Sequence, residues 1–175
     1  ALRKSVEDSL QNIGVDHIDL IQLHCPPWET YYRPEVFDLF DRLKAEGQIG
    51  ALGVSVEKVE QAIKAMEYDN VTTIQIIFNM FRQRPAELFF DLAKAKNVGI
   101  IVRVPLASGL LTGTYSANTT FGADDHRTFN RNGDAFDKGE TFSGIDYQKG
   151  LEAVRILKDH FGDTNLALLA IKWVL

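Results

Sequence analysis

The residues of this 175-residue chain that could do chemistry come directly after four apolar runs. Such runs, bounded by turn residues, are typical of buried β-strands. Ligands of parallel α/β proteins bind at the carboxyl ends of the strands. A polar or conformationally unusual segment follows each run: His24, Ser55, Asn79 and the stretch Pro105–Gly109. The coincidence at four successive runs predicts a binding site along that edge.

Three side chains in or after these runs offer distinct chemistry. The His24 imidazole can exchange a hydrogen bond with a substrate oxygen, although a capped histidine at a strand end has the same pattern. The Gln75 amide can donate and accept, which suits a carboxamide ligand, although simple alternation also explains it. Arg103 is costly in an apolar run. We expect it to face an anion or a π surface in a pocket, with a structural ion pair as the alternative.

Several motifs that would indicate other chemistry are missing. The chain contains no Gly-x-Gly-x-x-Gly or P-loop sequence, which argues against a Rossmann crevice. It has no His-Glu-x-x-His spacing for a metal. The segment Gly53–Glu57 lacks the last glycine of a serine nucleophile elbow. Gly109 and Gly113 instead flank a short loop whose backbone could approach a diphosphate closely.

Composition narrows the class of protein further. The net charge is -5, and the Lys and Arg residues are scattered, so nothing predicts binding to nucleic acid or to an anionic membrane. The one cysteine, Cys25, cannot form an intrachain disulfide. No apolar run reaches the roughly 20 residues of a membrane span, and no signal peptide is apparent. We therefore expect a cytoplasmic protein.

Helical and extended patterns alternate along the chain. Apolar residues recur at helical spacing, and the runs near 18–24, 49–55, 71–78 and 99–104 are predicted strands. Two of the helices are predicted over about 57–67 and 85–96, and a Gly-, Thr- and Asn-rich excursion covers about 113–144. This alternation predicts an α/β fold with a parallel sheet and one domain over 1–175. It does not separate a closed barrel from an open sheet.

Four segments, in order along the chain, resemble the aldo-keto reductase family. They are Leu10–Pro26, Gly47–Ser55, Ile74–Asn79 and Pro105–Gly113. The resemblance implies a (β/α)8 TIM barrel, of which this chain would hold a partial barrel of four parallel strands, about the fourth to the seventh. Both ends also look cut, so we interpret the chain as the middle of a longer protein.

The same resemblance implies an oxidoreductase that transfers hydride from NADPH to an aldehyde or ketone, with NADH as the other candidate cofactor. His24 would hydrogen-bond the substrate carbonyl. Ser55 and Gln75 would hold the nicotinamide carboxamide, and Arg127 would reach the cofactor's phosphates. The loop after the last strand would wrap the pyrophosphate. The remaining cofactor residues implied are Arg103, Val104, Pro105, Leu106, Ser108 and Gly109.

This chain departs from the family pattern in ways that bear on function. Val56 replaces a polar residue, and Arg103 and Val104 stand where many members have an aromatic residue followed by Ser. The family's catalytic Asp, Tyr and Lys belong to earlier strands, so we expect this chain alone to be inactive. Open strand edges would favour self-association of the isolated chain.

Two other functions stay open at this point. One is a non-catalytic, nicotinamide-binding barrel that acts as a regulatory or interaction subunit. The other is an unrelated barrel lyase or hydrolase that uses His24 as a general acid. Finding the family's catalytic Tyr and Lys in the complete protein would argue against the non-catalytic subunit. Binding of a nicotinamide cofactor would argue against the lyase or hydrolase.

Overall fold

The computed structural model describes residues 1–175, whose contacts divide into two compact units. Unit 1 comprises Ala1–Ile76 and Leu88–Ile101, and unit 2 comprises Ile77–Glu87 and Val102–Leu175. Each unit has its own cluster of buried apolar side chains. The prediction of a single domain over 1–175 stays a prediction.

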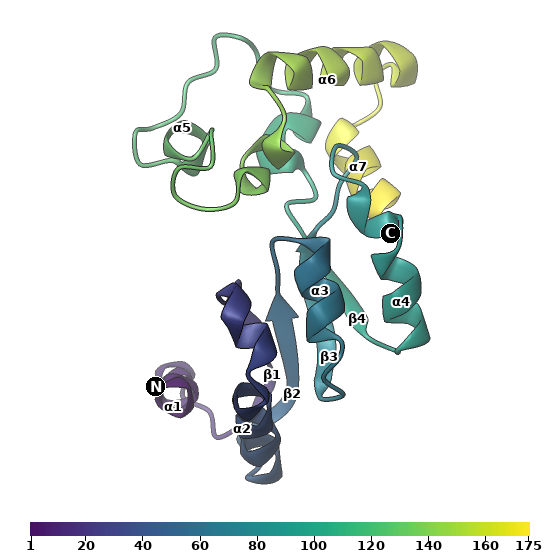
Figure 1. Cartoon of the computed structure of the whole chain (residues 1–175). Helices are drawn as coiled ribbons and strands as arrows, with labels where there is room; N and C mark the ends of the chain where they lie inside the picture. The colour runs from purple at the N-terminus through teal and green to yellow at the C-terminus, as the bar shows by residue number, and fades with distance from the viewer. The chain divides into compact units, whose positions relative to one another are not determined.

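Four strands form one sheet in the order β1-β2-β3-β4 (Figure 1). Their bounds are β1 Ile18–His24, β2 Ile49–Ser55, β3 Val71–Ile77 and β4 Gly99–Arg103. The pairs β1/β2 and β2/β3 are parallel, as the alternation predicted. The last two strands end one residue earlier than predicted.

The register of the sheet decides which side chains lie level. His24 pairs with Ser55, and Ser55 pairs with Gln75. Partners in adjacent parallel strands present their side chains on the same face, because successive residues of a strand alternate between faces. The three residues therefore form one row across the sheet, at the last residues of β1 and β2 and two residues before the end of β3.

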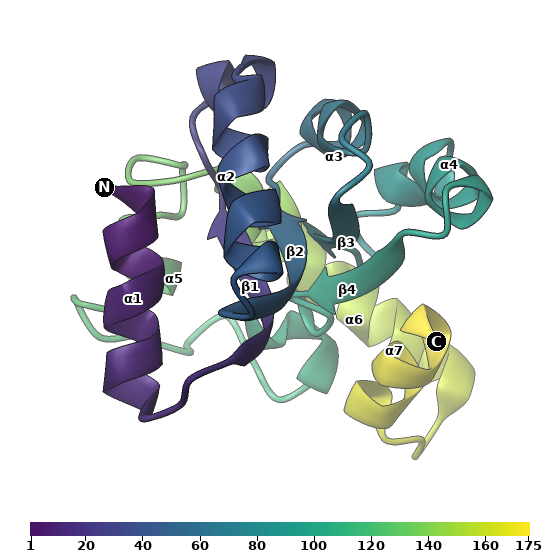
Figure 2. The same cartoon turned by 90° about the horizontal axis from the view of Figure 1, so that it is seen from below.

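Four helices of unit 1 lie along one side of the strands (Figure 2). They are α1 Leu2–Ile13, α2 Pro34–Ala45, α3 Val59–Ala65 and α4 Phe89–Ala95. In α2, Pro34 occupies the first turn, where its missing N–H is not needed. The apolar stripe of α2 is buried together with strand residues such as Val54 and Ile74. This packing fixes the opposite face of the strands as the one that carries His24, Ser55 and Gln75.

Helices α3 and α4 are shorter than predicted, for local reasons. The Gln61 side-chain oxygen accepts from the main-chain N–H groups of Glu57 and Lys58, both at 3.0 Å, so these residues precede α3 as its cap. Before α4, residues Arg84–Ala86 form a separate 3-10 turn. Apolar spacing alone does not distinguish such caps and turns from the helix itself.

Unit 2 consists mainly of helices and turns, together with the last residues of β3 and β4. Its elements are the 3-10 segments η2 Arg84–Ala86, η3 Ala107–Thr112, η4 Lys138–Glu140 and η5 Phe142–Gly144 and the helices α5 His126–Phe129, α6 Tyr147–Phe161 and α7 Leu166–Val174. The excursion predicted over 113–144 thus contains three short helical pieces. It contributes Phe142 to a core with Leu110, Leu111 and Tyr147.

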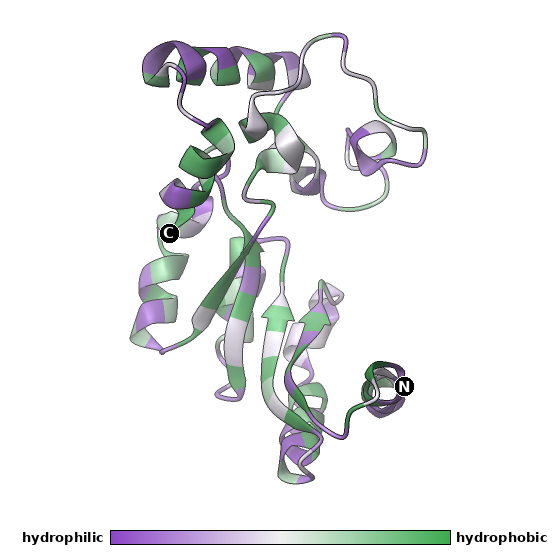
Figure 3. Ribbon diagram, turned by 180° about the vertical axis from the view of Figure 1, so that it is seen from behind, coloured by the Kyte–Doolittle hydropathy of each residue, from purple (hydrophilic) through white to green (hydrophobic).

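Helix α7 is the most apolar helix of unit 2, as Figure 3 shows by its green colour. Leu168, Ile171 and Trp173 remain exposed along it. Its length is nine residues, and none of the helices is both long and apolar enough to cross a membrane. Self-association through such apolar surface stays a prediction.

Candidate functional site

A chain of side-chain hydrogen bonds runs along the row at the strand ends in unit 1. The Ser55 hydroxyl donates to the Gln75 carbonyl oxygen at 3.1 Å, and the Gln75 amide nitrogen donates to the Gln22 oxygen at 3.1 Å. Ser55 is completely buried. Because these bonds hold both ends of the Gln75 amide, its plane is fixed.

The fixed Gln75 amide keeps part of its hydrogen-bonding capacity. An amide has two N–H donors and two acceptor lone pairs, and the bonds to Gln22 and Ser55 use one of each. One donor and one acceptor of the amide therefore remain. A carboxamide ligand presents the complementary pair, so the residue predicted to hold nicotinamide is prepared for such a group.

His24 is exposed at the end of β1, and the backbone turns sharply after it. Cys25 has φ of 45°, a left-handed conformation that is rare outside glycine. The Cys25 N–H donates to the Ser55 carbonyl at 2.9 Å, which holds this turn in place. Backbone strain of this kind is concentrated at functional sites, where surrounding contacts enforce it. The turn leaves the His24 imidazole accessible to a ligand.

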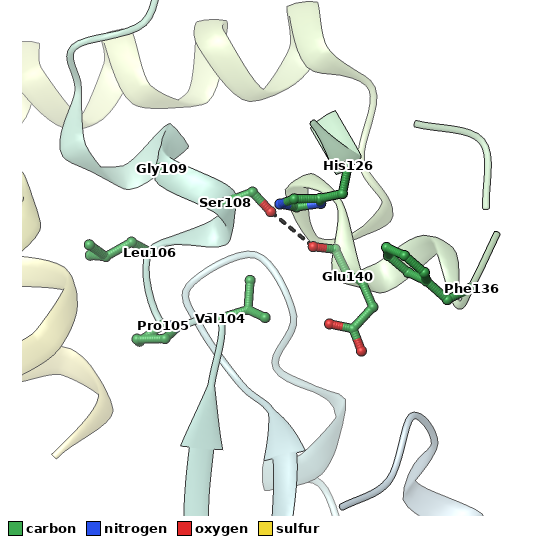
Figure 4. Close-up of a pocket in the computed structure, with 8 residues that line it drawn as sticks. All are labelled: Val104, Pro105, Leu106, Ser108, Gly109, His126, Phe136 and Glu140. Atoms are coloured by element: carbon green, nitrogen blue, oxygen red, sulfur yellow. Dashed lines mark hydrogen bonds between the residues drawn. The ribbon is translucent and has the colours of Figure 1, made fainter. Parts of the chain in front are cut away.

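In unit 2, the loop after β4 lines a cavity of about 490 Å³ (Figure 4). Five of the predicted cofactor residues line it together: Val104, Pro105, Leu106, Ser108 and Gly109. The excursion supplies the rest of the lining, namely His126, Phe136 and Glu140. The structure therefore brings the predicted loop residues to one concave surface.

The backbone of this loop is unusual over most of its length. Val104, Ala107, Ser108 and Gly109 have φ values of 55°, 48°, 55° and 94°. For a β-branched residue such as Val104, this conformation is an outlier. Neither the Leu106 nor the Ser108 N–H donates to another main-chain carbonyl. Main-chain N–H groups that a loop leaves unused can bind an anion.

Gly109 is needed for a reason the sequence did not reveal. A Cβ atom at this position would lie 2.3 Å from the Tyr115 hydroxyl oxygen, and the φ of 94° is itself unfavourable for other residues. At Gly113, a Cβ atom would lie 2.8 Å from Lys158 Cε. The two glycines therefore permit close packing within unit 2. Gly109 lines the cavity and Gly113 does not. Close approach of a diphosphate therefore stays a prediction for Gly109 only.

We expect Gly109→Ala to lower the free energy of unfolding by about 3 kcal/mol, since it adds a clash with Tyr115 to the cost of a left-handed alanine. Gly14→Ala is the matched control. Gly14 has φ of 78°, but nothing lies within 4 Å of its Cβ position. The control should cost about 1 kcal/mol. Denaturant unfolding measures both, and equal losses would show that the contact with Tyr115 is unimportant.

Arg103 forms an ion pair with Glu140, and both side chains are 15% exposed. This pair is the alternative that the sequence left open for a charged residue in an apolar strand. Glu140 belongs to the excursion rather than to a helix outside the sheet, and it lines the cavity. Direct contact between Arg103 and a cofactor stays a prediction.

Arg127 lies in a separate cluster within the excursion. Its guanidinium bonds to Asp125 and to the Tyr115 hydroxyl, and it lies 4.4 Å from the Phe121 ring centroid. The hydrogen bond from Arg127 holds the pKa of the Asp125 carboxyl well below its usual range. Asp125 in turn raises the pKa of Arg127. Arg127 does not line the cavity, so its contact with cofactor phosphates also stays a prediction.

Comparison with known proteins decides the family. The model of the "Aldo/keto reductase family" matches residues 1–175. The chain belongs to the aldo/keto reductase family. The aldo-keto reductase YhdN of Bacillus subtilis is 29% identical over 98% of this chain and 50% of its own length. The NADH-specific methylglyoxal reductase of Escherichia coli is 28% identical over 65% of this chain and 36% of its own.

A solved structure agrees with this result. The glycerol dehydrogenase AKR11B4 of Gluconobacter oxydans superposes with a TM-score of 0.73 at 33% identity, covering 99% of this chain and 50% of that one. The chain thus spans about half the length of the Bacillus and Gluconobacter relatives and 36% of that of the Escherichia coli relative, and it is a partial (β/α)8 barrel. The predicted family and fold are confirmed. The interpretation as an unrelated lyase or hydrolase barrel is wrong.

Several residues of unit 2 had no role assigned from the sequence. Asn79 is completely buried, and its amide nitrogen donates to the Val104 carbonyl at 2.9 Å and to the Ser143 hydroxyl at 2.8 Å. Its position after β3 was the available signal. His126, Phe136 and Glu140 come from an excursion without periodicity, so nothing in their spacing indicated the cavity.

Proposed function

We propose that this chain is the part of a nicotinamide-dependent carbonyl reductase that holds the substrate carbonyl and much of the cofactor. The observation that carries the proposal is the row of His24, Ser55 and Gln75, in which Gln75 keeps one donor and one acceptor free. Family membership supports the same reaction class.

In this proposal, His24 binds and orients the substrate carbonyl. An imidazole N–H that donates to a carbonyl oxygen draws electron density from the carbonyl carbon and fixes its orientation. When bound, the nicotinamide dinucleotide supplies the hydride. Ser55 holds the Gln75 amide, and Gln75 binds the carboxamide through its remaining donor and acceptor. The hydrogen bond from Ser55 thus prevents the Gln75 amide from rotating out of register.

The loop Val104–Gly109 has the phosphate-binding part. Its left-handed backbone, the unused N–H groups of Leu106 and Ser108 and the adjoining cavity fit a diphosphate. Main-chain donors suit this task, because they hold an anion without side-chain entropy to lose. Arg127 is proposed as a further phosphate contact.

We propose NADPH as the cofactor, with NADH as the alternative, and a small aldehyde or ketone as the substrate. The Escherichia coli relative is described as NADH-specific and as a methylglyoxal reductase, and the Gluconobacter structure as a glycerol dehydrogenase. Both descriptions concern small carbonyl or hydroxyl compounds. We place the protein in the cytoplasm, where a reduced nicotinamide cofactor is available to it.

An assay of cofactor oxidation tests the proposal. The protein that carries this chain is mixed with NADPH or NADH and with each of a panel of small aldehydes and ketones. We expect oxidation of the cofactor that depends on the carbonyl compound. Cofactor binding without oxidation by any carbonyl would favour the non-catalytic subunit instead. Absence of binding to either cofactor would overturn the proposed function.

A further inference from the structure

The lining of the cavity in unit 2 has an unexpected charge. Glu140 is acidic, and neither Lys nor Arg is among the lining residues. The phosphates of a dinucleotide are anions, and a nearby carboxylate of the same sign would repel them. A cavity built for phosphate groups therefore needs something that offsets this carboxylate.

The main chain of Glu140 is held beside the cavity by hydrogen bonds from the loop after β4. The Ser108 hydroxyl donates to the Glu140 carbonyl at 2.9 Å (Figure 4). The same hydroxyl accepts from the Phe142 N–H at 3.0 Å. Next to it, the Ser143 hydroxyl accepts from the buried Asn79 amide. Hydrogen bonds thus join the loop Val104–Gly109 to the segment Glu140–Ser143.

Arg103 is the cation that meets the Glu140 carboxylate. It does not line the cavity itself, and each side chain of the pair is only 15% exposed, so solvent screens the pair weakly. We propose that Arg103 is a positioning residue that neutralises Glu140 and so allows the cavity to take the diphosphate of a dinucleotide. This inference rests on the proposed function, and it gives Arg103 a part that requires no contact with the ligand.

The Arg103–Glu140 pair could stabilise the fold only, or it could neutralise the charge beside the cavity. Three variants distinguish these two roles. Arg103→Met leaves the Glu140 charge exposed to the ligand, so affinity for ADP-ribose should fall about tenfold. Glu140→Gln removes the repulsion and leaves Arg103 cationic, so affinity should rise several-fold. The double variant carries neither charge and should return to within about threefold of the parent. A structural pair would instead weaken binding in all three.

Calorimetric titration with ADP-ribose at low and high salt measures these affinities, and thermal unfolding confirms that each variant is folded. High salt should partly restore binding by Arg103→Met and reduce the gain of Glu140→Gln. A double variant that binds no better than Arg103→Met would overturn the inference. If Arg103→Met does not fold, Glu140→Gln decides alone, and unchanged or weaker binding would refute the proposal. A parent protein that binds neither ADP-ribose nor a nicotinamide cofactor would overturn the proposed function as well.

Discussion

Replacing His24 by alanine should lower kcat/KM for a small aldehyde by about 10²-fold or more in the protein that carries this chain. The reason is the loss of a positioned hydrogen-bond donor to the carbonyl oxygen. The imidazole is exposed at the end of β1 and level with Ser55. Cofactor affinity should change little, because Gln75 and the loop of unit 2 are intact. Steady-state kinetics and a cofactor titration measure the two effects separately.

His160→Ala is the matched control for this variant. His160 lies in the last turn of α6 and is exposed, with no part in the proposed site. Its replacement should leave kcat/KM within about twofold of the parent, since surface substitutions of this kind have small effects. A near-parental value for His24→Ala would remove the carbonyl-binding role from His24.

Asn79→Ala should strongly destabilise unit 2, because it removes a buried amide that makes four hydrogen bonds. The buried amide makes two donated bonds and also accepts from the N–H groups of Phe81 and Arg82 at 2.9 and 3.1 Å. Alanine leaves several of these partners buried without Asn79, at a cost of about 3 kcal/mol or more. For a chain of this size, that cost corresponds to a fall in Tm of roughly 6–12 °C.

Asn118→Ala provides the comparison, since Asn118 is exposed in the excursion and should change Tm by less than about 2 °C. Thermal unfolding followed by circular dichroism measures both variants. Asn79→Ala should also weaken binding of ADP-ribose, because Asn79 holds the Val104 carbonyl at the start of the loop. A Tm equal to that of the parent would mean that water replaces the amide, and the proposed support of the loop would be wrong.

The sheet and the row of residues on it followed from the sequence, because both depend on local patterns. Apolar runs bounded by turn residues define strands, and parallel strands place their carboxyl ends at one edge. His24 and Ser55 could therefore be assigned to that edge before the register was known, whereas Gln75 was recognised only as a polar residue within its apolar run. The hydrogen bond from Ser55 to Gln75 required the structure, since it depends on the pairing of β2 with β3.

Unit 2 was much harder to predict, for a physical reason. Its core joins Leu110 in the loop after β4 to Phe142 and Tyr147, more than 30 residues later, through contacts that have no period in the sequence. The partners of Arg103 and Ser108 lie equally far along the chain. The sequence indicated that Arg103 needed a partner or a ligand, but it could not indicate Glu140.

The central claim is that unit 1 binds nicotinamide and that unit 2 binds phosphate groups, and Gln75→Ala tests it most directly. The variant and the parent are titrated with the reduced dinucleotide and with ADP-ribose, which lacks nicotinamide. We expect the affinity for the dinucleotide to fall about tenfold, on the scale of one or two buried hydrogen bonds. Affinity for ADP-ribose should stay within about twofold. Equal losses for both ligands, or no loss for either, would contradict the claim.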